Sequence, residues 1–367
     1  MSLAAPRILC VAGDPGGANA LKPVLALLAN RFQLQFAAYR QALEIWQQAG
    51  WKVADLGASP TLDEARLVLR ETAPALLLTA TSVNGIDWER YLLQAARELA
   101  IPSVSLLDFW SNYSRRFSLQ ANLDSLPQQI CVMDQRACDE MIAEGFPAEV
   151  LQITGQPALD ASAVPIASEQ LLAARALWPA GSRRILFVSQ PLSALHGGAE
   201  GCRAVLGFDE QSVLALVFDV LAQLQQQGQM IAACVLPHPR ESAQDFLAAG
   251  YPLAQGFDAK VLVQAADIVI GMNSMLLLEA AAAGCVVISV QPDLRTADSL
   301  ATNQSGATLP VYRAVQLLPV LTSLLDDPAR YAQQQALARQ SAGDGQAAAR
   351  VALCAERLIA RQVNPIS

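Results

Sequence analysis

The sequence predicts an α/β protein made of two doubly wound, Rossmann-like domains. In both halves of the chain, short apolar runs alternate with segments of helical periodicity, a pattern typical of parallel sheets with helices on both faces. Between the halves, residues 161–183 hold one expected helix at 168–177 and end in a Pro-Ala-Gly-Ser break. We therefore expect an N-terminal domain at 1–165 and a C-terminal domain at 166–345.

Each expected strand of the first half is a short apolar run, which is typical of strands buried on both faces of a parallel sheet. These runs lie at 8–12, 33–37, 51–55, 76–79, 103–107, 130–132 and 150–154. The segments between them have the apolar spacing of amphipathic helices. The expected helices lie at 18–28, 41–49, 61–72, 88–99 and 136–144.

The second half repeats this alternation. Its expected strands lie at 184–189, 231–236, 267–270 and 285–290. Its expected helices lie at 210–227, 243–249, 258–265 and 313–326, with two more within 328–362. Residues 190–209 are rich in Gly, Ser and Ala and have a weak pattern, so we expect either a disordered loop or an active-site flap.

Charge and cysteine content exclude several classes of protein. The 367 residues carry a formal net charge of −8, which argues against a nucleic-acid-binding surface. The seven cysteines form no CxxC pair, so we expect buried thiols in a reducing compartment rather than disulfides or a zinc site. The chain has no apolar run of transmembrane length, and its first apolar run is too short for a signal peptide. We therefore expect a cytoplasmic protein without a transmembrane span.

Residues 267–290 contain the most informative motif, which has the pattern strand, turn, helix, glycine, strand. Asn273 or Ser274 can cap the start of the helix, and Gly284 can take the left-handed conformation at its end. Glu279 is the one carboxylate in an otherwise apolar helix, and a buried carboxylate without a partner is costly. A nucleotide ribose is one candidate partner, with the phosphates at the helix N-terminus. The alternative is a buried Rossmann-type helix whose glutamate reaches solvent.

This motif resembles the nucleotide-binding unit of GT-B-fold proteins. These include the UDP-N-acetylglucosamine 2-epimerases, the nucleotide-sugar glycosyltransferases and the glycerophosphotransferases of teichoic acid synthesis. In the epimerases the turn is Ser-Gly-Gly, and a glutamate two turns later holds the ribose. Asn273, Ser274, Met275 and Glu279 lie at the matching spacing in this chain, whereas the two turn glycines are absent.

Four further segments resemble GT-B proteins in the same order along the chain. They are the glycine-rich loop at 13–17, Thr-Gly-Gln-Pro-Ala-Leu-Asp at 154–160, the apolar run at 184–189 and Leu-Pro-His-Pro-Arg at 236–240. The resemblance implies a GT-B-like fold of two Rossmann-like domains facing across a cleft. It also implies that the C-terminal helix, within 346–367, packs back on the N-terminal domain.

For the C-terminal domain, the resemblance implies a nucleotide-sugar site, and we expect a UDP-sugar. His238 follows an expected strand and can donate a hydrogen bond to a diphosphate, with Arg240 adding charge; the alternative for a lone histidine is a structural role. The expected nucleotide- and donor-binding residues are His238, Arg240, Asn273, Ser274, Met275, Glu279, Gln291 and Arg295.

For the N-terminal domain, polar residues follow the expected strands at the edge where open α/β sheets bind ligands. Asp14 and Asp108 are the carboxylates that can remove a proton from an acceptor hydroxyl. The alternatives are a tight strand–helix turn at Asp14, a packed aromatic loop capped by Asp108, and a helix cap at residues 81–84. The expected acceptor-side residues are Gly13, Gly16, Gly17, Thr81, Ser82 and Trp110.

Together these features predict a nucleotide-sugar-dependent glycosyltransferase of glycan or surface polysaccharide synthesis. Because no Asp-x-Asp pair ends an expected strand, we expect no metal requirement, no covalently bound cofactor, and helix amides that stabilise the leaving group. One alternative is a nucleotide-sugar 2-epimerase or hydrolase, although the His-x-Glu pair of the epimerases is absent. Another is a non-catalytic nucleotide-sugar-binding protein. The expected partners are a nucleotide-sugar and a glycan or small-molecule acceptor. The identity of the donor and of the acceptor stays open, and so does the choice between a monomer and an oligomer.

Overall fold

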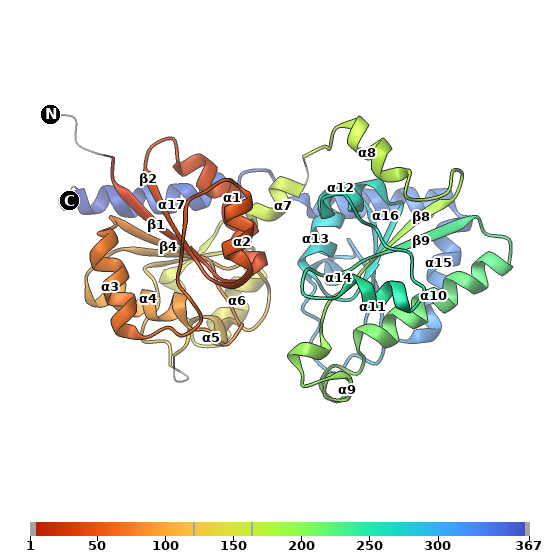
Figure 1. Ribbon diagram of the computed structural model, residues 1–367, viewed down its shortest axis with the longest axis horizontal. Coiled ribbons are helices and arrows are strands. Elements are labelled where there is room, and N and C mark those ends of the chain that lie inside the picture. The colour runs from red at the N-terminus through yellow and green to blue at the C-terminus, as the bar shows by residue number, and fades with distance from the viewer. Residues whose placement is uncertain (1–4, 120–121, 163, 364–367) are drawn as a thin grey trace. The chain divides into compact units, whose positions relative to one another are not determined.

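A computed structural model describes residues 5–119, 122–162 and 164–363. The chain divides into two compact units, which we call unit 1 and unit 2 (Figure 1). Unit 1 comprises Met1–Ala161 and Gly343–Ser367, and unit 2 comprises Ser162–Ala342. From the sequence we placed the corresponding boundaries after residues 165 and 345.

Unit 1 is built on a parallel sheet, in which the described residues form seven strands in the order β3-β2-β1-β4-β5-β6-β7. The strands are β1 (Arg7–Ala12), β2 (Gln33–Ala38), β3 (Val53–Asp55), β4 (Leu76–Thr79), β5 (Ser103–Leu106), β6 (Gln129–Val132) and β7 (Leu151–Ile153). The central strands β4 and β5 are buried along their whole length. The strand order reverses between β1 and β4, and such a reversal is where open α/β sheets bind ligands.

The helices of unit 1 follow its strands, as the alternation predicted. They are α1 (Pro15–Leu28), α2 (Arg40–Gln48), α3 (Leu62–Thr72), α4 (Trp88–Glu98), α5 (Tyr113–Phe117), α6 (Gln135–Ala143), most of α7 (Pro157–Ser162) and α17 (Ala347–Val363). Helix α17 returns from the far end of the chain to pack on α1 (Figure 1). Asp160 fixes its start, because Oδ2 accepts from the amides of Ala347 and Ala348 at 2.6 and 3.4 Å. The 154–160 segment thus anchors the C-terminal helix.

Unit 2 has a second parallel sheet, with the order β12-β11-β10-β8-β9 among the described residues. Its strands are β8 (Arg183–Val188), β9 (Ile231–Leu236), β10 (Ile268–Gly271), β11 (Val286–Val290) and β12 (Leu309–Val311). After β9 the chain crosses to the other side of β8, so the order reverses between β8 and β10. Both units are therefore doubly wound Rossmann-like domains, which confirms the predicted fold class.

The helices of unit 2 cover its sheet. They are α8 (Ser168–Arg175), α9 (Ala199–Leu206), α10 (Glu210–Gln226), α11 (Ala243–Ala248), α12 (Ala259–Ala265), α13 (Met275–Ala282), α14 (Ala301–Ser305), α15 (Leu317–Asp326) and α16 (Pro328–Arg339). In the described part of the chain, no helix is both long and apolar enough to cross a bilayer. All seven cysteines are free and six are buried, as expected from their spacing.

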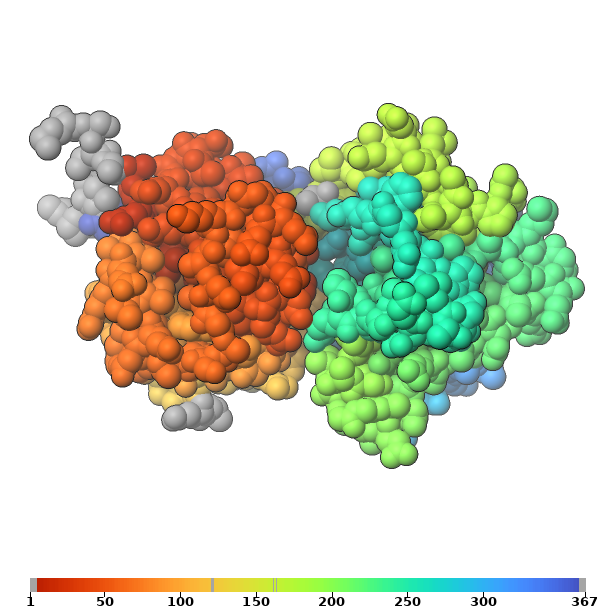
Figure 2. Space-filling view, viewed as in Figure 1, coloured from red at the N-terminus to blue at the C-terminus, as the bar shows by residue number. Residues whose placement is uncertain are grey.

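The structure corrects two local predictions. Of the two alternatives for residues 190–209, the disordered loop is wrong, because the segment contains α9, which projects from the surface of unit 2 (Figure 2); the active-site flap stays a prediction. Cys202 of this helix is fully buried in the core of unit 2, and this packing outweighs the weak helix propensity of a Gly-rich segment. Helix α1 begins at Pro15 rather than residue 18, since proline suits the first turn of a helix.

Candidate functional site

In unit 2, the predicted donor-binding residues follow β9, β10 and β11 at one edge of the sheet. The turn between β10 and α13 is tied to β8, because the amide of Asn273 donates to Oε1 of Gln190 at 3.0 Å. The Asn273 side chain donates to Oγ of Ser299 at 3.4 Å. The turn is therefore held by hydrogen bonds to two side chains, those of Gln190 and Ser299.

Ser274 occupies the N-cap position of α13 with extended backbone. Its side chain makes no cap hydrogen bond, and its Oγ is buried without a hydrogen-bond partner among the described residues. Leaving a buried hydroxyl unsatisfied costs about 1–3 kcal/mol. Because the helix N-terminus beside it attracts anions, a phosphate oxygen is a suitable partner for this hydroxyl. Met275, the other residue of the predicted turn, is the first residue of α13.

Glu279 lies in the next turn of α13 and is partly buried. Burial raises the pKa of its carboxyl, while the charge of Lys260 and a hydrogen bond from Ser162 lower it. The carboxylate thus has a partner within unit 2, so the sequence argument that it lacks one does not hold for the unliganded protein. A ribose hydroxyl would share or replace the bond from Ser162.

His238 follows β9 and is held as a neutral imidazole. Its amide donates to Oε2 of Glu241 at 2.8 Å, and its Nδ1 accepts from the amide of Arg240 at 3.1 Å. Burial, with a smaller effect of the charge on Arg240, lowers the pKa of His238 to about 4. Because Nδ1 accepts, the proton lies on Nε2, which is free to donate to a ligand. Sequence reasoning missed Glu241, whose Oε1 accepts from Ser189 at the end of β8 at 2.8 Å.

The remaining predicted donor residues differ in placement. Gln291 is fully buried after β11; its Nε2 donates to Ser289 and Asp298 at 3.0 and 3.1 Å, and its Oε1 has no partner among the described residues. Arg295 is exposed and its guanidinium donates to the carbonyl of Ala204 on α9 at 3.2 Å. Gln291 therefore belongs to the polar network behind the β10–α13 turn, whereas Arg295 anchors α9.

In unit 1, the three glycines of the 13–17 segment are required by internal packing. A Cβ on Gly13 would lie 2.2 Å from Cζ of Tyr39, and one on Gly16 would lie 2.6 Å from Oδ2 of Asp108. A Cβ on Gly17 would meet Ala80 at 2.5 Å. The sequence interpretation was that these glycines let a ligand approach the backbone. In the structure they make room for the side chains of Tyr39, Asp108 and Ala80.

Asp14 is the N-cap residue of α1, but its side chain does not cap that helix. Oδ1 instead accepts from Nδ2 of Asn84 at 2.8 Å, and Oδ2 accepts from the amide of Val83 at 3.3 Å. These contacts join the ends of β1 and β4 at the reversal of strand order. Asp14 is only partly buried, so its carboxylate can reach a ligand.

Asp108, at the end of β5, is 8% exposed and paired with a buried cation. Its Oδ1 accepts from Nη1 of Arg116 at 2.5 Å and from Oγ1 of Thr81 at 2.9 Å. Burial raises the pKa of Asp108, and the Arg116 charge opposes that rise. Gln156 donates to the Asp108 carbonyl at 2.8 Å. The structure therefore brings Thr81 and Asp108 together, with Arg116 as a partner that the sequence did not indicate.

Trp110, one of the expected acceptor-side residues, is packed within the loop after β5. The ring is 5% exposed, and the indole N–H donates to Oδ2 of Asp134 at 2.7 Å. Tyr113 is buried as well and donates to Oε2 of Glu140 at 2.5 Å. This arrangement corresponds to the packed aromatic loop that was the alternative interpretation of the segment.

Glu89 is the main residue of unit 1 that sequence reasoning missed. It lies on α4, is 3% exposed, and accepts from Oγ of Ser82 at 2.6 Å and from the hydroxyl of Tyr39. Burial raises its pKa to about 7. A signal was present, because position 89 falls on the apolar helical stripe formed with positions 92, 93 and 96. A carboxylate in such a stripe needs buried partners.

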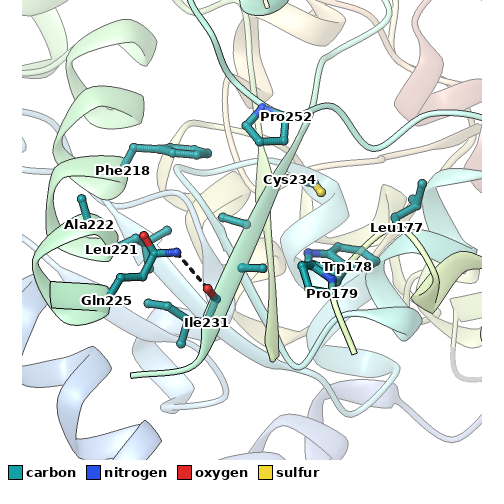
Figure 3. Close-up of a pocket in the computed structure, with 12 residues that line it drawn as sticks. Leu177, Trp178, Pro179, Phe218, Leu221, Ala222, Gln225, Ile231, Cys234 and Pro252 are labelled. Carbon is teal, nitrogen blue, oxygen red and sulfur yellow. Dashed lines mark hydrogen bonds between the residues drawn. The ribbon is translucent and has the colours of Figure 1, made fainter. Parts of the chain in front are cut away.

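Unit 2 also contains a pocket that is separate from these residues. It has a volume of about 480 Å³ and lies along β9, between α10 and the Leu177–Pro179 segment (Figure 3). Trp178, Phe218 and Leu221 give it a mainly apolar lining. None of the predicted site residues lines this pocket. In the described residues, no three His, Cys, Asp or Glu side chains gather as metal ligands.

Comparison with solved structures shows the fold. A UDP-GlcNAc 2-epimerase from Neisseria meningitidis bound to UDP-GlcNAc matches with a TM-score of 0.70 at 16% identity, covering 96% of this chain and 100% of that one. The UDP-GlcNAc 2-epimerase of Methanocaldococcus jannaschii in complex with UDP-GlcNAc and UDP matches with a TM-score of 0.70 at 12% identity, covering 96% and 99%. The glycotransferase of kitacinnamycin matches with a TM-score of 0.62 at 14% identity, covering 97% and 100%.

The protein thus has the GT-B fold, in agreement with the resemblance found in its sequence. No protein-family model matches the chain, and no curated protein matches it significantly. At identities of 11–16% the likeness establishes the architecture, and the reaction has to be argued from the residues of the two units.

Proposed function

We propose that the protein is a nucleotide-sugar-dependent glycosyltransferase that binds the diphosphate of a UDP-sugar at the β10–α13 turn of unit 2. The observation that carries this proposal is the buried, unpartnered hydroxyl of Ser274 at the N-terminus of α13. It lies beside the reversal of strand order in the sheet, the usual ligand edge of an open α/β fold. A phosphate there would satisfy the hydroxyl and the free helix amides together.

Two side chains in unit 2 have a chemistry suited to the rest of the nucleotide. The neutral imidazole of His238 donates from Nε2 to a phosphate oxygen, and this bond strengthens as negative charge develops on the leaving diphosphate. Glu279 accepts from a ribose hydroxyl, because its carboxylate already accepts from the hydroxyl of Ser162. Neither role needs a metal ion, so we propose metal-independent transfer.

In unit 1, Asp14 is the better candidate for the general base. Its carboxylate is partly exposed, and amide donors hold both oxygens, leaving further lone pairs to accept a proton. Asp108 is nearly buried and paired with Arg116, so removing its charge would leave that cation without its carboxylate partner. In the proposed step, the acceptor hydroxyl transfers its proton to Asp14 as its oxygen forms the new glycosidic bond and the bond to the diphosphate breaks.

A nucleotide-sugar 2-epimerase is the second candidate. It is favoured by the solved UDP-GlcNAc 2-epimerases that share the fold over nearly the whole chain. The buried acid Asp108, with its raised pKa, follows β5, the strand after which the epimerase pattern has its His-x-Glu pair. Epimerisation at C2 must move a proton at carbon, and a carboxyl with a raised pKa suits that task better than a fully ionised one.

Calorimetric titration with UDP tests the proposed site directly. We expect Ser274→Ala to weaken binding by about 10- to 150-fold, since a hydrogen bond to a charged group contributes about 1.5–3 kcal/mol. Ser323→Ala is the matched control, because among the described residues its hydroxyl bonds only to the carbonyl of Val320 on α15. Equal affinities for the Ser274 variant and the wild type would remove the basis of the proposal.

Product analysis with labelled UDP-GlcNAc separates the reactions. Label transferred to an acceptor supports the glycosyltransferase, and labelled UDP-ManNAc or free sugar supports the epimerase or hydrolase. The same assay in EDTA tests metal independence. Turnover abolished by EDTA and restored by Mn²⁺, or full transferase activity in Asp14→Asn, would contradict the mechanism.

A further inference from the structure

The segment 82–86 of unit 1 is held almost residue by residue by side chains from other elements. Asp14 accepts from the amide of Val83 and from the side chain of Asn84. Ser82 donates to Glu89, and the carbonyl of Ile86 lies 3.3 Å from the hydroxyl of Tyr39. The conformation of this segment therefore sets the donors that surround the candidate base Asp14.

Tyr39 has one hydroxyl proton and two acceptors within reach. Its oxygen lies within hydrogen-bond distance of both Oε2 of Glu89 and the carbonyl oxygen of Ile86. Its ring is fully buried against Gly13, where a Cβ could not fit, so the hydroxyl cannot swing away. The protonation of Glu89 decides which acceptor receives the Tyr39 proton.

We propose that Glu89 is a positioning residue for Asp14, acting through the hydrogen bond that Tyr39 makes with the 82–86 segment. When Glu89 is ionised, Tyr39 donates to Oε2 and the Ile86 carbonyl loses this donor. When Glu89 is neutral, Oε2–H donates to the Tyr39 oxygen and Tyr39 donates to Ile86, while Oε1 still accepts from Ser82. Neutral Glu89 thus adds one bond to the segment that holds Asp14.

The groups that face Glu89 make this exchange accessible near neutral pH. Burial raises its pKa to about 7, the bonds from Ser82 and Tyr39 lower it, and the charge of Asp14 raises it. Arg90, the neighbour on α4, directs its guanidinium to the carbonyls of Ser82 and Ile86 and to Asp87 instead. The Ile86 carbonyl therefore keeps one long contact of 3.4 Å with Arg90 when Tyr39 turns away.

The test uses the full-length protein without substrate, so it does not depend on the proposed reaction. In ¹⁵N spectra of perdeuterated protein between pH 5 and 9, we expect the amides of Val83 and Asp87 to titrate together with a midpoint near 7. The Asp87 amide reports on Ile86, because the two share a peptide group. Glu89→Gln should abolish both titrations, and Tyr39→Phe should abolish the one at Asp87 while keeping the ring packed on Gly13.

Glu140→Gln is the matched control, because Glu140 also accepts from a buried tyrosine hydroxyl of unit 1; it should leave both titrations as in the wild type. Absence of titration at the two amides in the wild type would overturn the proposal, as would a wild-type response in Glu89→Gln. A response at Asp87 that persists in Tyr39→Phe would overturn the path through Tyr39.

The activity readout depends on the proposed function and can fail separately. Once turnover is measured, the pH profile of kcat should lose one inflection near pH 7 in Glu89→Gln, with less than a threefold change in KM. An unchanged kcat profile alongside abolished amide titrations would show that the segment moves without acting on Asp14, and so would overturn the positioning role. Wild-type protein that titrates but has no turnover would contradict the proposed function alone.

Discussion

Replacing Glu89 by Gln should flatten the dependence of unit 1 stability on pH. Burial raises the pKa of Glu89 from its usual 4.5 to about 7 in the folded protein. The folded state holds this proton more tightly than the unfolded state does. Its contribution to the free energy of unfolding is therefore fully present below pH 4.5 and is lost as the pH rises through 7. At 1.36 kcal/mol per pH unit, the loss amounts to about 3 kcal/mol. Glutamine does not titrate, so the free energy of unfolding of the variant does not fall in this way as the pH rises.

Urea unfolding followed by tryptophan fluorescence measures this effect. Four of the five tryptophans, Trp46, Trp51, Trp88 and Trp110, lie in unit 1, so the signal reports mainly on that unit. We expect the free energy of unfolding of the variant, relative to the wild type, to rise by about 3 kcal/mol between pH 4.5 and 8.5.

Glu98→Gln is the control of opposite sign, because the Arg66 guanidinium lowers the pKa of this exposed carboxyl. The Glu98→Gln variant should therefore not gain stability relative to the wild type as the pH rises. If the difference between Glu89→Gln and the wild type stays constant within 1 kcal/mol over this range, the assigned burial of Glu89 is wrong.

Three further substitutions test other contacts. Gly16→Ala should destabilise unit 1 by about 1–3 kcal/mol in thermal unfolding, because its Cβ would lie 2.6 Å from Oδ2 of Asp108; wild-type stability would mean that Asp108 relaxes freely. Asp160→Ala should cost about 1 kcal/mol by freeing the first amides of α17, and no loss would show that solvent satisfies them equally well. Glu279→Ala should weaken UDP binding in calorimetry by about 1.5–3 kcal/mol; unchanged affinity would limit Glu279 to its contact with Ser162.

Much of the candidate site follows from the order of the elements. Parallel strands place their carboxyl ends at one edge of the sheet, so residues directly after expected strands, such as Asp14, Asp108 and His238, could be assigned to that edge in advance. Glu279 stood out because it interrupts an apolar helix. Glu89 interrupts the apolar stripe of α4, but its neighbours in the sequence do not reveal that the hydroxyls of Ser82 and Tyr39 accommodate it.

What the sequence could not indicate is which side chain each functional residue contacts. The partners of Asp14 are 69 and 70 residues away along the chain, and the glycines of the 13–17 segment make room for Tyr39, Asp108 and Ala80. Local patterns hold no information about such pairs, so a glycine-rich turn looks the same whether a ligand or a tyrosine ring occupies the space.

The sequence by itself determined the two doubly wound domains, because strand and helix periodicities are local properties set by which faces of each element are buried. It also located the β10–α13 unit and the left-handed Gly284 that ends its helix, confirmed by φ of +82°. Only the tertiary structure decided that residues 199–206 are helical, that Trp110 is buried and that Glu89 and Tyr39 support the segment around Asp14. These features depend on packing and hydrogen bonds between segments far apart in the chain, whose free energies exceed the weak local preferences.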